Sequence, residues 1–121
     1  MEESVIGNKS FAFAVRIVRL YQFLADKHEF VLSKQILRSG TSIGANVSEA
    51  LEAQSKRDFI SKMSIALKET SETIYWLKLL KETDYLTEQQ FHSIHGDAIE
   101  IKKILTAIIK TAKQRLEEHN E

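Results

Sequence analysis

Apolar side chains recur every three or four residues along most of this chain, and short polar breaks divide the repeat into four segments. A spacing of three and four places side chains on one face of an α-helix. We therefore expect helices over residues 10–26, 31–53, 55–83 and 87–116. The repeat is longest in the last segment, where it runs through Phe91, Ile94, Ala98, Ile101, Leu105, Ile108 and Ala112.

Polar residues at two of the breaks predict where a helix begins. Ser55 is followed three residues later by Asp58, and Thr87 is followed three residues later by Gln90. Both pairs have the pattern of a capping box, in which two side chains bond backbone N–H groups that a helix start leaves unpaired. The third and fourth helices should therefore start directly after Ser55 and Thr87.

Four helices with short connections predict an all-α fold, and we expect an antiparallel up-down-up-down four-helix bundle. Asn8 or Ser10 would cap the first helix, and residues 117–121 are expected to fray from the last one. The chain has 121 residues, no proline and no linker-like segment. It is expected to form a single domain over residues 1–121, with a core over about residues 9–116.

The first helix is apolar on two sides. Its only polar stripe consists of Arg16, Arg19, Gln22 and Asp26, whereas a surface helix normally has a wide polar face. Two explanations are open: a second chain covers one side, or the helix runs through the centre of the monomer's own core. We favour the first, and the candidate oligomer-interface residues are Phe11, Phe13, Ile17, Leu20 and Leu24.

The second helix carries a stripe of small residues within residues 35–50. Gly40 and Gly44 lie on it one turn apart, although a glycine costs about 1 kcal/mol relative to alanine inside a helix. The cost is explained if another backbone must approach closely, because small side chains let helices pack at short distance. Both glycines are therefore added to the candidate oligomer interface.

A polar cluster of Arg38, Asn46 and Glu49 interrupts the same stretch. Asn46 and Glu49 are three residues apart and share a helix face, and Arg38 precedes them by two turns. The cluster could line a pore or a binding groove. The alternative, which we favour, is a hydrogen-bonded network that fixes helix register or a subunit joint.

Charge and composition narrow the functional classes. Seventeen basic and seventeen acidic side chains cancel, whereas a nucleic-acid-binding domain is typically basic. The chain has no cysteine, which excludes disulfides and thiolate metal sites. The acidic N-terminus lacks a signal-peptide pattern, and no uncharged apolar run is long enough to span a membrane. We therefore expect a cytoplasmic protein with no membrane partner.

The sequence contains no catalytic or cofactor motif that we recognise. The four histidines are His28, His92, His95 and His119, and none has a glutamate three positions before it, as the Glu-x-x-His motif of di-iron bundles requires. No Gly-x-Ser-x-Gly turn or phosphate-binding glycine loop occurs. We therefore expect no metal, no cofactor and no enzymatic activity.

Residues 42–50 read SIGANVSEA, and residues 35–39 read QILRS. They resemble the S-I-x-x-N-I-A-E-G signature and the preceding Q-[IL]-x-R-[SA] run of the 23S rRNA-intervening-sequence protein family, also called the S23 family. Further matches lie at Ser55, Arg57, Phe59 and residues 66–70. Ser48 and Ala50 stand where the signature has alanine and glycine, so we expect the helix to continue past them. The resemblance covers about residues 11–116.

This resemblance implies a left-handed four-helix bundle that assembles into a ring, typically a homopentamer. Genes of the family lie in intervening sequences of bacterial 23S rRNA, which gives the family its name but no activity. The family is also similar to the accessory protein of diversity-generating retroelements, a basic pentameric barrel that binds a reverse transcriptase and nucleic acid. The neutral charge of the present chain departs from that protein.

Two functions follow as hypotheses. The first is a non-enzymatic, homo-oligomeric four-helix-bundle protein that acts as a scaffold or interaction protein. The alternative is a nucleic-acid-binding accessory factor, for RNA or DNA, that acts as a ring. The candidate nucleic-acid contacts are Lys56, Arg57, Lys102 and Lys103.

Overall fold

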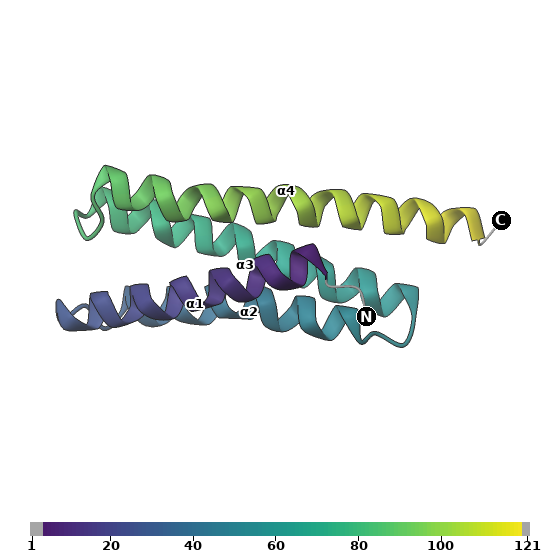
Figure 1. The fold of residues 1–121 in the computed structure, drawn as a ribbon, viewed down its shortest axis with the longest axis horizontal. Helices are drawn as coiled ribbons and strands as arrows, with labels where there is room; N and C mark the ends of the chain where they lie inside the picture. The colour runs from purple at the N-terminus through teal and green to yellow at the C-terminus, as the bar shows by residue number, and fades with distance from the viewer. Residues whose placement is uncertain (1–3, 120–121) are drawn as a thin grey trace.

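The computed structural model describes residues 4–119, which fold into four α-helices with no strand among them. The helices are α1 (Val5–Asp26), α2 (Leu32–Leu51), α3 (Lys56–Glu82) and α4 (Glu88–His119). Figure 1 shows α4 along one edge of the molecule beside α3, with α1 and α2 together on the other side. The prediction of an all-α fold with four helices is confirmed.

The first helix begins earlier than its sequence suggested. Ser4, and neither Asn8 nor Ser10, is the capping residue, and its hydroxyl accepts a hydrogen bond of 3.0 Å from the N–H of Gly7. Ile6 lies in the core with 3% of its surface exposed. Burial of that side chain stabilises an additional helical turn, so the first helix begins at Val5 and not at about residue 10 as expected; residues 1–3 lie outside the described range.

Both predicted capping boxes are present, one of them in full. The hydroxyl of Ser55 accepts from the N–H of Asp58 at 3.0 Å. The hydroxyl of Thr87 accepts from the N–H of Gln90 at 3.1 Å, and the Gln90 side chain accepts from the N–H of Thr87 at 2.9 Å. These bonds satisfy N–H groups that have no partner within the helix, and they place the starts of α3 and α4.

The start of α2 is stabilised in a different way, by a glutamate that precedes the helix. The buried carboxylate of Glu29 accepts hydrogen bonds from the N–H of Ser33 at 2.6 Å and of Val31 at 3.3 Å. His28 before it adopts the left-handed conformation (φ 62°), and the N–H of Glu29 donates to the carbonyl of Leu24 at 2.9 Å. Together these residues end α1 and begin α2, a role that the charged break in the sequence did not reveal.

The helix ends lie close to their predicted places. The second helix ends at Leu51, two residues before the expected end, and α3 ends at Glu82. The last helix continues to His119, so residues 117–119 are helical where fraying was expected; residues 120–121 lie outside the described range. As expected, α2 continues past Ser48 and Ala50.

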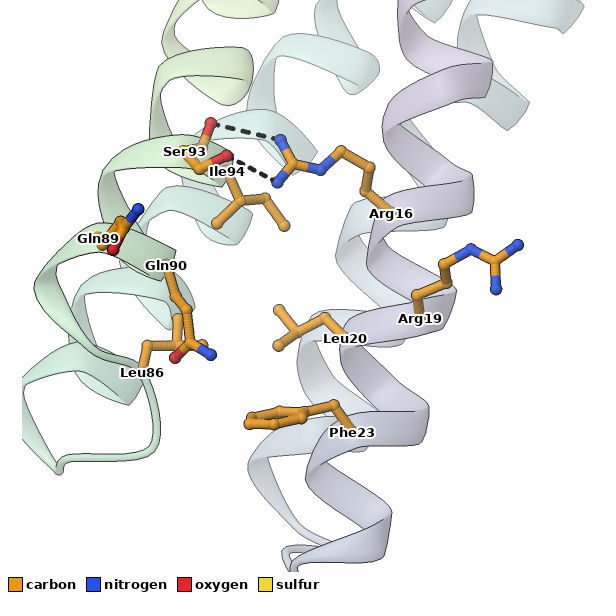
Figure 2. A pocket seen from close by; sticks show the side chains of 9 residues that line it. All are labelled: Arg16, Arg19, Leu20, Phe23, Leu86, Gln89, Gln90, Ser93 and Ile94. Carbon is orange, nitrogen blue, oxygen red and sulfur yellow. Dashed lines mark hydrogen bonds between the residues drawn. The ribbon is translucent and has the colours of Figure 1, made fainter.

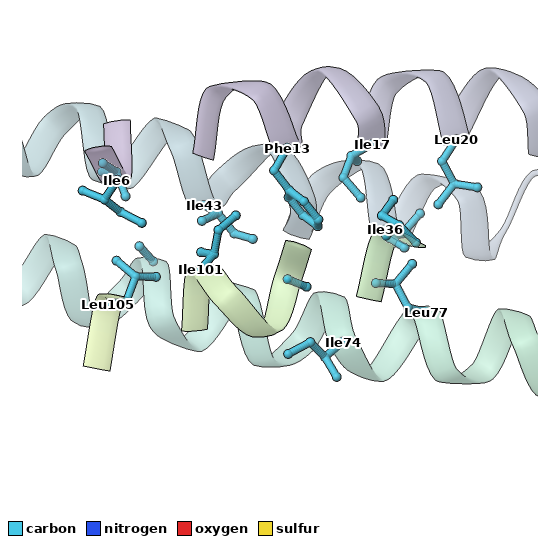
Figure 3. Packing of buried hydrophobic residues seen from close by; sticks show 14 of the residues in the cluster. Ile6, Phe13, Ile17, Leu20, Ile36, Ile43, Ile74, Leu77, Ile101 and Leu105 are labelled. Carbon is cyan, nitrogen blue, oxygen red and sulfur yellow. The ribbon is translucent and has the colours of Figure 1, made fainter. Parts of the chain in front are cut away.

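One apolar core joins all four helices (Figure 3). Residues with no exposed surface include Ile17 and Leu24 of α1, Ile36 of α2, Leu77 of α3 and Leu105 of α4. Burying a side chain of this size contributes about 1.5–3 kcal/mol relative to leaving it in water. The core therefore sits along the seams that the three-and-four spacing predicted.

The helices share their contacts unequally. Each helix packs extensively against its neighbour in the sequence, and the contact of α2 with α3 is the largest. The contact of α1 with α4 is much smaller than the other three. The bundle is therefore tightly packed on three sides, and its fourth side is formed by a looser pairing of α1 with α4.

Candidate functional site

The side of α1 that faces away from the core carries an apolar stripe. It consists of Phe11, Ala14, Val15 and Val18, which we call the outer face of α1. The exposed fraction is 71% for Phe11, 41% for Val15 and 39% for Val18. The stripe lines a shallow depression together with Arg19 and Gln22. The two-sided apolarity of the first helix thus has two different causes, since one side lies in the monomer's core and the other faces solvent.

Most of the residues predicted at an oligomer interface lie inside the monomer, which corrects that assignment. Phe13, Ile17, Leu20 and Leu24 are at most 9% exposed, because they form the seam of α1 that packs on the rest of the bundle. Only Phe11 of the predicted α1 set is exposed. The neighbouring Val15 and Val18, which the sequence analysis did not select, extend the outer face.

The two glycines of α2 also serve the monomer. A Cβ atom built on Gly40 would lie 2.7 Å from Cγ1 of Ile17, and one built on Gly44 would lie 3.2 Å from the backbone oxygen of Ser10. Both glycines therefore let α1 approach α2 within the same chain. The predicted close approach of another backbone is present, but that backbone is α1 of the monomer.

Two ion pairs connect α1 with α4. Lys9 Nζ lies 2.7 Å from Glu100 Oε1, and Arg16 Nη1 lies 2.6 Å from Asp97 Oδ2. The second guanidinium nitrogen of Arg16 donates to the hydroxyl of Ser93 at 3.0 Å. All four charged side chains are between 41% and 55% exposed, so this contact is polar and accessible to solvent.

Beyond Arg16 the two helices border a groove, which we call the α1–α4 groove (Figure 2). Its volume is about 470 Å³, and its apolar surface comes from Leu20, Phe23, Leu86 and Ile94. In Figure 2 the side chains of Leu20 and Phe23 point from α1 toward α4, while Arg16 reaches across to Ser93 and Arg19 turns away. Gln89 and Gln90 supply neutral polar groups at the edge.

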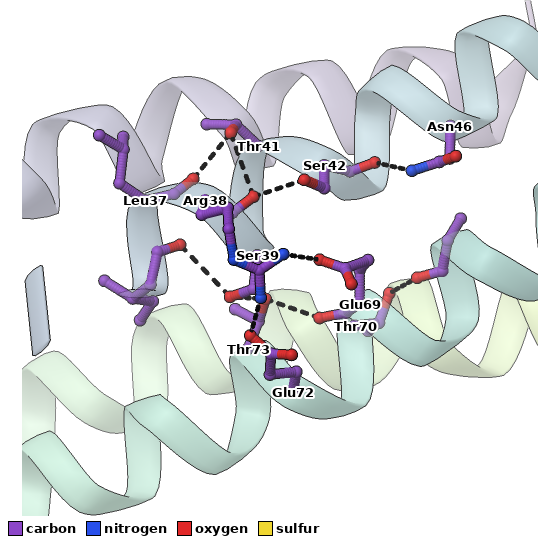
Figure 4. A network of polar contacts seen from close by, with 12 residues as sticks. Leu37, Arg38, Ser39, Thr41, Ser42, Asn46, Glu69, Thr70, Glu72 and Thr73 are labelled. Atoms are coloured by element: carbon purple, nitrogen blue, oxygen red, sulfur yellow. Dashed lines mark hydrogen bonds and ion pairs between the residues drawn. The ribbon is translucent and has the colours of Figure 1, made fainter. Parts of the chain in front are cut away.

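The polar contacts between α2 and α3 centre on Arg38 (Figure 4). Its guanidinium donates to Glu69 at 3.2 Å and also to Glu72. The hydrogen bond to Glu72, followed by the charge of Glu69, raises the pKa of Arg38 above its usual value. Deeper inside, the hydroxyl of Thr73 donates to that of Ser39 at 2.9 Å, and both side chains are fully buried. This network satisfies polar groups that would be costly to bury alone.

Arg38, Asn46 and Glu49 do not form one cluster, contrary to the sequence analysis. Asn46 donates to the backbone oxygen of Ser42 at 2.8 Å, and Glu49 lies 3.5 Å from Lys62. The three side chains make separate contacts along α2, because two turns of helix keep Arg38 away from the other two. Each of the three therefore makes its own contact, and they do not share one hydrogen-bonded network.

Neither acidic partner of Arg38 could be identified from the sequence. Glu69 is 9% exposed as a residue, although charged residues are seldom buried. The sequence did contain a sign of this burial. Glu69 and Thr73 each lie three or four residues from apolar residues of the third helix, and this spacing places them on the same face. Their partners on α2 are more than thirty residues away in the sequence, and no local spacing reveals such a pairing.

The four candidate nucleic-acid contacts are all exposed but lie in two places. Arg57 borders a groove with Lys113 at the end of α4, so Lys56 and Arg57 adjoin the C-terminal part of that helix. Lys103 precedes Lys113 by ten residues, which is about 15 Å along a helix. The structure therefore separates Lys102 and Lys103 from the first pair.

Cations outnumber the acidic residues Asp58, Glu117 and Glu118 in the neighbourhood of Lys56 and Arg57. Lys110, Lys113 and Arg115 of α4 are exposed, and within the described part of the chain none of these five side chains forms an ion pair. Unpaired cations at one end of the molecule offer positive charge to an anionic partner.

The histidines do not form a metal site in the described chain. Among the side chains of residues 4–118, no group of three or more histidine or acidic side chains is arranged to hold a metal ion. His95 stacks on Phe91 with ring centres 4.6 Å apart, and its buried Nε2 has no hydrogen-bond partner. Burial, followed by the charges of Lys78, His92 and Lys81, lowers the pKa of His95.

None of the four described helices has a stretch that is apolar and long enough to cross a bilayer. The arrangement has two apolar surfaces, the outer face of α1 and the α1–α4 groove, and one basic end. Surfaces of these two kinds are suited to binding other molecules.

Two comparisons with known proteins identify the same family. The family model described as 23S rRNA-intervening sequence protein matches residues 2–107. A crystal structure of a protein of unknown function from the S23 ribosomal protein family of Bacteroides thetaiotaomicron VPI-5482 is similar, with 61% sequence identity and a TM-score of 0.87. The match covers 88% of this chain and 99% of that chain. A comparison with curated proteins finds no match.

Proposed function

Because the chain belongs to the 23S rRNA-intervening sequence protein family, we propose that it is a non-enzymatic scaffold protein that assembles with copies of itself. The observation that carries the proposal is the outer face of α1, with Phe11, Val15 and Val18 exposed in a single stripe. Isolated apolar residues are common on protein surfaces, but a contiguous stripe is typical of an association surface.

The energetics favour covering this stripe. Removing apolar surface from water contributes roughly 25 cal/mol per Å², and complete burial of a phenylalanine or valine side chain about 1.5–3 kcal/mol. Phe11 is the most exposed of the large apolar residues, together with Val31. Association through the outer face therefore removes the most unfavourable exposed surface of α1 without opening the core.

The topology belongs to the same proposal. We place the four helices in an antiparallel, up-down-up-down, left-handed bundle. Contacts between Ile17 and Gly40 and between Ser10 and Gly44 support opposite directions for α1 and α2. The pairings of Lys9 with Glu100 and of Arg16 with Asp97 support the same relation for α1 and α4. A closed ring, with five subunits as the family resemblance implies, completes the proposed assembly.

The test is the molar mass in solution, measured by size-exclusion chromatography with light scattering. We expect the wild-type chain to have a mass of several subunits, and Phe11→Asp and Val15→Asp to lower that mass because a buried charge disfavours the joint. The matched control is Ile65→Asp on α3, since Ile65 is 39% exposed and Val15 is 41% exposed. A monomeric wild-type protein would contradict the proposal, as would Phe11→Asp and Val15→Asp variants of unchanged mass.

A second candidate function is nucleic-acid binding, which the unpaired cations around Lys56, Arg57 and Lys113 favour. Phosphate contacts release counterions, so such binding weakens steeply as salt rises. The same chromatogram distinguishes the two functions. An absorbance ratio typical of nucleic acid that disappears at high salt would favour this second function, and a protein-like ratio at low salt would favour the scaffold alone.

A further inference from the structure

Helix α1 is too short to reach the end of the bundle at which α2 joins α3. Figure 1 shows α1 beginning short of that turn, whereas α4 continues beyond it. Lys9, which meets Glu100, lies one turn from Val5, the first residue of α1. Past this level α4 continues to His119, over roughly 20 Å of helix at 1.5 Å per residue. The last part of α4 therefore packs on α3 without α1 beside it.

The face of α4 that meets α1 continues along this uncovered part. Ser93, Asp97 and Glu100 are residues of α4 that bond to α1. Steps of three and four residues carry the same face on to Ile104, Ala107, Ile108, Thr111 and Arg115. All of these except Ile104 line one depression of about 330 Å³, together with Ala112 and with Phe59 of α3. The surface that a longer α1 would cover is thus present, and α1 leaves it open. We call it the α4 depression.

The α4 depression is apolar at its centre. Phe59 and Ile108 pack against the core and remain only partly buried. Ala107 and Ala112 beside them are small, so the backbone of another helix can approach closely. A groove between two helices with an apolar floor is suited to the apolar side of an amphipathic helix. The lining therefore favours a helix as the occupant, in the direction that α1 already follows.

The charge of this face changes sign along α4. Where α1 lies, α4 presents Asp97 and Glu100, and α1 supplies the cations Lys9 and Arg16. The only charged residue that lines the α4 depression is Arg115, which forms no ion pair in the described chain. A helix that continues the line of α1 is therefore attracted here by acidic side chains, where α1 itself uses basic ones.

The charges around the depression favour the same sign. Lys103 and Lys110 each lie within one turn of Ala107 and are exposed, and among the described residues neither has an ion-pair partner. The nearest acidic residues in the sequence are Asp58, Glu117 and Glu118, none of which lines the depression. An acidic partner therefore meets cations at the lining and along the outer edge.

We propose that the α4 depression binds an acidic amphipathic helix of a partner protein, in line with α1. The apolar side of that helix covers Phe59 and Ile108, and its carboxylates face Arg115. Nucleic acid is less suited to this surface, because Phe59 is the only aromatic residue among the lining residues and bases would find little to stack on. Residues 1–3 of the chain span at most about 10 Å, less than the roughly 16 Å of helix from Ile104 to Arg115, so they are too short to fill it. A single chain supplies the whole site, so the proposal is independent of self-association.

Fluorescence anisotropy with a labelled synthetic peptide tests the proposal. The probe is a helical peptide of about 14 residues, or ~21 Å, with leucines at three-and-four spacing on one face and glutamates on the other. A second peptide has lysines in place of the glutamates. We expect saturable binding of the glutamate peptide and binding of the lysine peptide that is weaker by about tenfold or more. Equal affinity for the two peptides would overturn the proposal, as would a glutamate peptide that does not bind.

Substitutions in α4 locate the binding surface. Arg115→Glu and Ala107→Asp should each weaken binding of the glutamate peptide by roughly fivefold to tenfold, because they place negative charge where the peptide docks. Both residues are exposed, so the fold is retained. Lys102→Glu is the matched control, with the same change of charge as Arg115→Glu on the opposite side of α4. It should leave the affinity almost unchanged. An equal loss of affinity in Lys102→Glu and Arg115→Glu would show a general effect of net charge and would overturn the proposed site.

The molar mass of the same variants separates this proposal from the proposed function. An unchanged mass together with weakened peptide binding in Arg115→Glu and Ala107→Asp supports the proposal. A lower mass in these variants would assign the α4 depression to a joint between copies and would overturn it. A monomeric wild-type chain that binds the glutamate peptide would overturn the self-association alone. A labelled single-stranded RNA that binds where the peptide does not, and whose binding Arg115→Glu abolishes, would overturn the proposal in favour of nucleic-acid binding.

Discussion

Helix α1 makes two contacts of different physical kinds, one with α2 and one with α4. On the α2 side, Gly40 and Gly44 leave room for Ile17 and for the backbone at Ser10, so the helices meet through closely packed atoms. On the α4 side, Lys9 and Arg16 span the gap through exposed ion pairs. Helix α1 is thus in close-packed contact with α2 and is connected to α4 by ion pairs.

The difference follows from the residues that face α1. The glycines of α2 present only backbone, and short interhelical distance gives dispersion contacts to many atoms at once. At the positions of α4 that face Lys9 and Arg16, Asp97 and Glu100 have side chains that reach toward cations. Exposed pairs of this kind contribute about 0–1 kcal/mol each, less than one buried isoleucine, so the packed joint holds α1 in place.

The largest effect is expected where the packed joint is closest. In Gly40→Ala, the new methyl group would meet Ile17 at 2.7–3.0 Å, and Ile17 has no exposed surface into which it could move. Overpacking of a core costs about 1–3 kcal/mol, which exceeds the gain of about 1 kcal/mol from replacing glycine by alanine in a helix. Urea unfolding should therefore show a lower free energy of unfolding.

Gly96→Ala in α4 is the matched control. A Cβ at this position meets nothing within 4 Å, and the residue is exposed and helical. Here only the helix-propensity term acts, so the free energy of unfolding should rise by about 0.5–1 kcal/mol. If both variants were stabilised equally, Gly40 would not be required for the approach of α1 to α2.

The same joint shows how far the sequence determines the structure. The glycine stripe correctly predicted a close approach of helices, and the three-and-four spacing predicted the number of helices and most of the core. Neither pattern identifies the partner, because a backbone of the same chain and one of a second chain require the same small residues. For this reason Gly40, Gly44 and Ile17 were assigned to an oligomer joint when they pack within the monomer.

The outer face of α1 shows the opposite case, because apolar residues that the sequence analysis did not select are exposed there. An excess of apolar residues on the first helix was visible in the sequence, but the side that the monomer covers depends on how α2 and α4 are placed around it. The polar contacts were less predictable still. Arg38 meets Glu69 and Glu72 of α3, and Arg16 meets Asp97 eighty-one residues later, pairings that only the packing of the helices determines.

The charged joint should respond to mutation less strongly and to salt more strongly. A double-mutant cycle with Arg16→Ala and Asp97→Ala should give a coupling free energy of about 0.2–1 kcal/mol at low salt, because the pair is exposed. The coupling should decrease in 0.5 M NaCl, since the Debye length then falls well below 10 Å. The cycle is measured by urea unfolding at both salt concentrations.

A comparison with the α2–α3 contact sharpens this test. The two cations are similarly exposed, at 54% for Arg38 and 41% for Arg16, but the Glu69 side chain is only 12% exposed whereas that of Asp97 is 48% exposed. A cycle with Arg38→Ala and Glu69→Ala should therefore retain more of its coupling at high salt, because a pair with one buried partner is screened less than a pair with two exposed partners. Equal salt sensitivity of the two cycles would show that the α1–α4 joint is no more open to solvent than the α2–α3 contact.

The smallest of the effects concerns the α3–α4 contact, where His95 lies against Phe91 near Lys78 and Lys81 of α3 and His92 of α4. Burial and these cations lower the pKa of His95 in the folded state, so the unfolded chain takes up a proton at a higher pH than the folded chain does. The free energy of unfolding should then fall as the pH decreases below about 6.5, the ordinary value for histidine, until the lowered folded-state pKa is reached. Thermal unfolding between pH 8 and pH 5 measures this dependence. His95→Gln should reduce it most, and His92→Gln should reduce it less, because His92 supplies only one of the charges that lower the pKa of His95. An identical pH dependence in wild type and His95→Gln would show that protonation of His95 does not control the stability of this contact.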